Sequence, residues 1–205
     1  MSFFTELTKK PWVPAQAAID NAEQGNLLPV PAATLGLRVL LGVMTVLFSL
    51  FVIAYSDRMV VAGWRPLPEP WLLWINTAIL VLSSVAMHRA VLGARQGDGE
   101  RVKTGLQWAG ISAFAFLAGQ LWAWQLLVAE GYYAASNPAN AFFYLLTAVH
   151  GLHLLGGLVA WYRAAARVRR ASDVAETVLS VELCAIYWHF LLVVWLVLFG
   201  LLLFS

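Results

Sequence analysis

The sequence predicts an all-α fold: a polytopic membrane protein with five transmembrane helices, its N-terminus inside and its C-terminus outside. Of the 205 residues, 61% are hydrophobic and only 12% are charged, which is unlike the composition of a soluble globular domain. The apolar residues form five continuous runs of roughly 20 residues, the length that a helix needs to cross a bilayer. A transmembrane barrel would need many short segments of alternating hydrophobicity instead. Helices are favoured because each one satisfies its own backbone hydrogen bonds in lipid.

The five spans are expected at residues 35–55, 71–91, 106–128, 141–162 and 181–204. All prolines fall outside these runs, and the connections contain helix-breaking or charged stretches such as GARQGDGER and RAAARVRRASD. Connections this short leave no room for a soluble domain. We therefore expect two parts: an N-terminal arm on the cytoplasmic side, residues 1–34, and a five-helix membrane domain, residues 35–205. The arm has no apolar core resembling a signal peptide and is expected to be retained.

The orientation follows from the positions of the lysines and arginines, which concentrate on the cytoplasmic side of membrane proteins. With the N-terminus inside, only Arg58 and Arg65 of the 13 basic residues lie outside. The basic residues sit between the spans or near their inner ends, so the net charge of +2 does not indicate a nucleic-acid partner. Trp64, Trp71 and Trp74 lie near the expected outer interface, where tryptophans anchor helix ends. The single cysteine excludes an intramolecular disulfide and a thiolate cluster.

Ionisable and amide side chains inside the spans are the candidate functional residues, because a charge at the bilayer centre costs roughly 3 kcal/mol. Glu182 and His189 are seven residues apart and lie on one side of the fifth helix. His150 and His153 are three apart on the fourth helix, and Asn76 lies in the second. We expect Glu182 and His189 to face protein, with at least one of them bonded to a group on another helix. The fourth helix is the natural candidate.

Three kinds of chemistry compete for these histidines. A haem needs axial ligands on opposite faces of the ring, so His150 and His153 cannot both ligate one haem, although one of them could pair with His189. Copper or zinc would need three or four ligands, and the spans offer no cysteine cluster. A continuous proton relay would need more acidic residues in the spans. Interhelical hydrogen bonding that fixes the packing requires no cofactor and is the remaining alternative.

Two motifs resemble those of a known family. The stretch FFYLLTAVHGLHLLGGLVAWY, residues 142–162, is followed in the last span by Glu182, then by Tyr187-Trp188-His189-Phe190, and then by Trp195. WLLWINTAILVLSSVAMHRA and GLQWAGISAFAFLAGQLWAW supply two further similar helices. Their order and spacing over residues 35–204 resemble the haem-copper oxidase subunit III family (cytochrome c oxidase subunit 3), in a short five-helix form.

The resemblance implies a non-catalytic subunit of a respiratory terminal oxidase that reduces oxygen to water coupled to proton translocation. Haem and copper would lie in subunit I, with no catalytic, cofactor-binding or metal-binding residue in this chain. Subunit I would be the main partner, joined by subunit II, other small subunits and phospholipids held in a cleft between two helix groups. The location would be the bacterial inner membrane. The residues with supporting roles in packing, lipid binding or proton uptake would be His150, His153, Glu182, Trp188, His189 and Asn76.

Alternatives to this assignment remain at the level of sequence. Within the family, the chain could serve a quinol oxidase or a nitric oxide reductase complex, because other subunits recognise the electron donor. Outside the family, it could be a stand-alone haem b cytochrome or a small transporter. One position departs from the family pattern: Thr45 stands about where the first shared helix commonly has a carboxylate.

Overall fold

The computed structural model describes residues 31–60, 64, 71–171 and 174–204, so most of the predicted N-terminal arm and the prolines of the first connection lie outside the described residues. Five helices are long and apolar enough to cross a membrane, and the described residues contain no strand. The helices are α3 (Ala32–Met59), α4 (Leu72–Gln96), α5 (Gly99–Ala129), α6 (Pro138–Arg170) and α7 (Val178–Leu203). The predicted all-α class with five spans is confirmed. The chain divides into two units after Leu40, and the contacts described below lie within the second.

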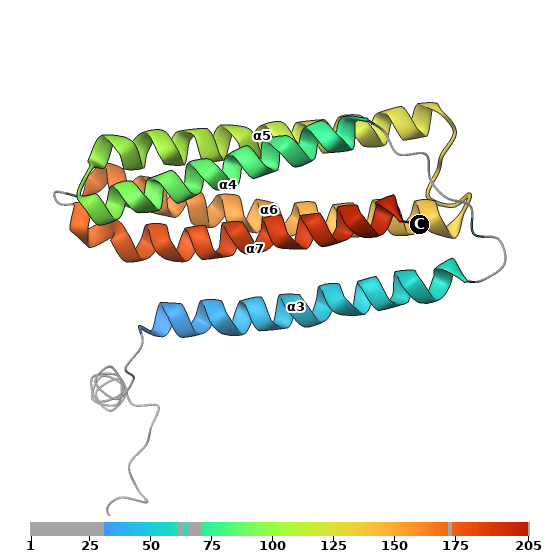
Figure 1. Cartoon of the computed structure of the whole chain (residues 1–205), viewed down its shortest axis with the longest axis horizontal. Coiled ribbons are helices and arrows are strands. Elements are labelled where there is room, and N and C mark those ends of the chain that lie inside the picture. The colour runs from blue at the N-terminus through green and yellow to red at the C-terminus, as the bar shows by residue number, and fades with distance from the viewer. Residues whose placement is uncertain (1–30, 61–63, 65–70, 172–173, 205) are drawn as a thin grey trace, which may run out of the picture. The chain divides into compact units, whose positions relative to one another are not determined.

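Helices α4 to α7 form an antiparallel four-helix bundle (Figure 1). Each helix packs on two others: α4 on α5 and α7, and α6 on α5 and α7. This is the arrangement expected when consecutive helices are joined by short connections and run up and down. The centre of the bundle is therefore built from one face of each helix. At most ends the helices extend a few residues beyond the predicted spans, because the predicted spans include only the apolar residues.

The connection between α4 and α5 shows why these two helices are such close neighbours. Gly97 has a φ of 72°, the left-handed conformation that commonly ends a helix, and Asp98 caps α5 by accepting a hydrogen bond from the backbone N–H of Arg101 at 3.0 Å. The helices then touch closely. A Cβ at Gly105 would lie 2.8 Å from the carbonyl oxygen of Ala86, so only glycine permits this approach.

Helix α6 begins with a proline and ends with basic residues. Asn137 caps it by accepting a hydrogen bond from the N–H of Ala139 at 3.2 Å, and Pro138 occupies the first turn, where its missing N–H is not needed. Its last turn contains Arg167, Arg169 and Arg170. A single 3₁₀ turn, η1 (Val174–Thr177), then leads into α7.

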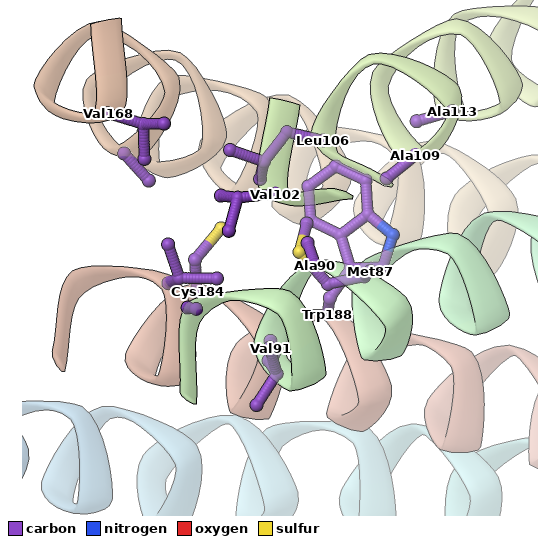
Figure 2. Packing of buried hydrophobic residues seen from close by; sticks show 14 of the residues in the cluster. Met87, Ala90, Val91, Val102, Leu106, Ala109, Ala113, Val168, Cys184 and Trp188 are labelled. Carbon is purple, nitrogen blue, oxygen red and sulfur yellow. The ribbon is translucent and has the colours of Figure 1, made fainter. Parts of the chain in front are cut away.

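The main apolar cluster lies between the four helices of the bundle, towards the α4–α5 turn (Figure 2). Met87 of α4, Leu106 of α5 and Trp188 of α7 are at most 2% exposed. Many of their neighbours are small, including Ala90, Ala109 and the free thiol Cys184. Small residues let membrane helices approach closely enough for dispersion forces and interhelical hydrogen bonds to stabilise the bundle.

Candidate functional site

Glu182 forms an ion pair at the end of the bundle that contains the α4–α5 turn. Its Oε1 accepts a hydrogen bond from Nε of Arg95, near the end of α4, at 2.8 Å. The Arg95 side chain is 62% exposed and that of Glu182 is 29% exposed. Charges that remain in contact with a polar environment gain at most about 1 kcal/mol from pairing. The pair therefore links α7 to α4 without requiring either charge to be buried in lipid.

His189 is bonded to the same helix. Its Nδ1 lies 2.5 Å from Oγ of Ser84 on α4. The ring centroid of His88, one turn further along α4, lies 6.1 Å from that of His189. The expectation that α6 would supply the partners of Glu182 and His189 is therefore wrong. Both side chains bond to α4, because the face of α7 that contains them packs on α4.

Trp188, next to His189, begins a hydrogen-bond chain across three helices. Its Nε1–H donates to Oγ of Ser83 on α4 at 3.0 Å, and the Ser83 hydroxyl donates to the carbonyl oxygen of Ala109 on α5 at 2.8 Å. Trp188 is 1% exposed and Ser83 is fully buried. The Trp188 N–H and the Ser83 hydroxyl hydrogen therefore both have acceptors, as buried polar groups in an apolar setting require.

The two histidines of the HGLH segment have different surroundings. His150 is fully buried, with its ring centroid 5.9 Å from that of Phe116 and 5.2 Å from that of Trp195. His153 is half-buried, its Nδ1 lies 2.7 Å from the carbonyl oxygen of Val149 in the same helix, and its ring centroid is 5.3 Å from that of Phe48. His150 thus faces the centre of the four-helix bundle, whereas His153 faces α3.

Asn76 of α4 is 1% exposed and faces α5. A Cβ placed on Gly119 would lie 2.1 Å from Oδ1 of Asn76, so the amide packs directly against the backbone of α5. Any larger residue at position 119 would displace it. Asn76 is therefore part of the same closely packed α4–α5 contact as Gly105.

The histidines do not assemble into a metal centre within the described part of the chain. There, no group of three His, Cys, Asp or Glu side chains could hold a metal ion together. His88 and His189 approach each other, but they would provide two ligands where zinc or copper sites ordinarily use three or four. These two imidazoles alone would therefore not complete a zinc or copper site.

Comparison with known proteins settles the family. The family model described as cytochrome c oxidase subunit III matches residues 34–204. The chain belongs to the cytochrome c oxidase subunit III family. Cytochrome c oxidase subunit 3 of Synechocystis sp. is 36% identical over 163 residues, which cover 75% of this chain and 67% of the relative. A probable cytochrome c oxidase subunit 3 of Nocardia farcinica is 30% identical over 160 residues, covering 75% and 76% of the two chains.

The match confirms the family suggested by the HGLH and YWHF motifs. In the structure, His150 of HGLH faces the centre of the bundle, whereas Trp188 and His189 of YWHF bond to α4. Sequence reasoning missed the specific partners, above all Ser83, Ser84 and Arg95. The signal for the serines was present, since positions 76, 83 and 84 fall on one face of α4. Without knowing that α7 packs there, that face could not be paired with its partner.

Proposed function

We propose that this chain serves as the non-catalytic subunit III of a respiratory haem-copper oxidase, where it packs beside subunit I and stabilises it together with bound lipid. The single observation that supports this is the family match over residues 34–204, which includes every helix of the bundle. The polar side chains agree with a structural role. Glu182, Trp188 and His189 are each engaged in bonds between helices.

The proposal extends to the location and the partners. A five-helix chain of this family belongs in the bacterial inner membrane, with its N-terminus on the cytoplasmic side and subunits I and II as neighbours. The exposed surface of α3 is an argument for an apolar neighbour in the membrane. It has an apolar stripe in which each side chain is 59–64% exposed, formed by Val43, Val46, Leu50 and Ile53. Lipid tails and the apolar helices of another subunit match such a stripe equally well.

A groove between the second half of α3 and α7 is the proposed lipid site. It has a volume of about 330 Å³ and an almost entirely apolar lining, which includes Phe48, Phe190 and Val197. Thr45, the residue in the place of the family's usual carboxylate, also lines it, and its hydroxyl donates to the Leu41 carbonyl oxygen of its own helix at 2.8 Å. An acyl chain suits a groove whose only hydroxyls are Thr45 and Ser49.

Copurification tests the assignment. An affinity tag on this chain should recover a complex that contains haem and consumes oxygen, with subunits I and II in equal amounts. Recovery of the chain without a haem-containing partner would refute the assignment. The same preparation separates the alternatives within the family: oxidation of reduced cytochrome c, oxidation of quinol and consumption of nitric oxide each identify a different complex.

The lipid site needs its own test. Replacing Val197 by Trp fills the groove and should reduce the phospholipid that remains bound to the purified complex, together with activity sustained over many turnovers. Ile186→Trp is the matched control, since Ile186 is 47% exposed on the same helix but does not line the groove. Equal lipid content and equal sustained activity in both variants would contradict a lipid role for this groove.

A further inference from the structure

Three uncharged polar side chains are buried in the bundle without hydrogen-bond partners for most of their polar atoms. Asn76 of α4 is 1% exposed, Gln120 of α5 is 4% exposed and His150 of α6 is fully buried. Among the residues that the structure describes, nothing pairs with Nδ2 of Asn76, with either polar atom of the Gln120 amide or with either ring nitrogen of His150. Elsewhere in the bundle, buried groups such as those of Ser83 and Trp188 are paired.

The three side chains lie at one level of the bundle. Asn76 packs against Gly119, the residue before Gln120. One turn before Gln120, the ring of Phe116 lies 5.9 Å from that of His150. Helices α4, α5 and α6 therefore each contribute one of the unpaired polar groups to the same layer.

Helix α7 closes this layer with Trp195. Its ring centroid is 4.9 Å from that of Phe116 and 5.2 Å from that of His150. Its Nε1–H donates to the hydroxyl of Thr77, the residue after Asn76, at 2.9 Å. The Trp195 indole therefore contacts His150 on α6 and bonds to Thr77, the neighbour of Asn76 on α4. The indole N–H itself has a hydrogen-bond partner.

Leaving five polar atoms unpaired in the apolar interior would cost far more than a marginally stable bundle tolerates. Buried polar atoms that lack protein partners are usually bonded to internal water, which makes about three hydrogen bonds per molecule. Amides and imidazoles offer donors and acceptors together. Water matches both, whereas an ion matches only one kind.

We propose that the layer of Asn76, Gln120 and His150 is a binding site for ordered internal water, about two molecules by the usual hydrogen-bond count, that bridges α4, α5 and α6. The water connects the three helices through side chains that, within the described residues, make no direct hydrogen bond to one another. His150 is then held by hydrogen bonds through water, not by a metal or a haem. The apolar cluster around Trp188, nearer the α4–α5 turn, needs no such water because its indole is bonded to Ser83.

X-ray footprinting on the intact oxidase complex tests this directly. Radiolysis of a bound water molecule produces a hydroxyl radical that oxidises the side chains beside it, even where bulk solvent does not reach. The comparison uses two tryptophans of α7, Trp195 beside the layer and Trp188 away from it, which are 0% and 1% exposed. Oxidation of Trp195 several-fold faster than that of Trp188 is expected. Equal rates would overturn the proposal.

A pair of variants shows whether the polar layer is responsible. Gln120→Leu removes two of the unpaired atoms and should reduce the oxidation of Trp195 towards the rate for Trp188. Gln125→Leu is the matched control, because Gln125 is exposed on the same helix. An unchanged rate in Gln120→Leu would also contradict the proposal. If this variant fails to enter the complex, the two tryptophans of the unmodified complex decide the question alone.

Discussion

The buried hydrogen-bond chain from Trp188 through Ser83 to Ala109 should contribute measurably to the stability of the bundle. Replacing Ser83 by Ala removes one bond of 3.0 Å and another of 2.8 Å and leaves the indole N–H without its acceptor. Hydrogen bonds between membrane helices average about 0.6 kcal/mol and reach about 1.7 kcal/mol. Two such bonds and an unpaired buried donor place Ser83→Ala at a loss of about 1 to 3 kcal/mol in the free energy of unfolding.

The bond between Ser83 and Trp188 can be isolated with a double-mutant cycle. Trp188→Phe removes the donor but also changes the volume, and the cycle with Ser83→Ala cancels that volume effect when the sites otherwise act independently. The expected coupling energy is about 0.6 to 1.7 kcal/mol, or about a 3- to 18-fold change in the unfolding equilibrium constant. It is measured most simply in detergent, with denaturation followed by a thiol-reactive dye.

Cys184 makes this assay specific, because it is the only cysteine of the chain and is buried in the native bundle. The matched control is Ser56→Ala, whose hydroxyl is exposed and bonds only to the Val52 carbonyl oxygen of its own helix at 2.9 Å. It should change the unfolding free energy little. A coupling energy near zero, with Ser83→Ala no more harmful than Ser56→Ala, would refute the reasoning.

Two further substitutions probe the packing and the charge pair. Gly105→Ala should cost about 1 to 3 kcal/mol in the same denaturation assay, because the new Cβ would meet the backbone of α4; Gly200→Ala, with nothing within 4 Å, should cost much less, and equal effects would contradict the close approach. Glu182→Leu should cost less than about 1 kcal/mol in the isolated chain, since Arg95 remains largely exposed. A much larger loss confined to the assembled oxidase would mean that a neighbouring subunit buries the pair.

Periodicity and length were enough to predict the number and positions of the helices. Residues 71–91 and 106–128 were expected as spans, and α4 and α5 contain nearly all of both. The ends differ because the apolar run measures hydrocarbon thickness, whereas helix ends depend on capping residues such as Gly97 and Asp98. Pro138 likewise lies in a predicted connection, yet it begins α6, where a proline is favoured.

The partners within the candidate site were harder to predict. A histidine at position 189 says that some polar group must face it, but the sequence does not say which helix supplies that group. The helix order gave α6 as the neighbour of α7, and α6 does pack on α7. The bundle is closed, however, so α7 also packs on α4, and the polar face of α7 lies on that side. Sequence adjacency favoured one of two neighbours, and the hydrogen bonds follow the other.

The contact between α4 and α7 explains how an apolar bundle is assembled in a fixed register. Lipid is as apolar as the helices, so hydrophobicity gives α7 no preference for one position along α4. Polar pairs do, and they occur at several levels of this contact: Thr77 with Trp195, Ser83 with Trp188, Ser84 with His189, and Arg95 with Glu182. Thr77 and Ser84 are seven residues apart on α4. Their partners on α7, Trp195 and His189, are six residues apart in the opposite order, as expected for two antiparallel helices in one register. A slide of α7 by one turn would break all four pairs together and leave buried hydroxyl and indole groups unpaired. The polar residues of the last helix therefore specify where that helix packs, which is the physical reason for placing Glu182 and His189 in an otherwise apolar segment.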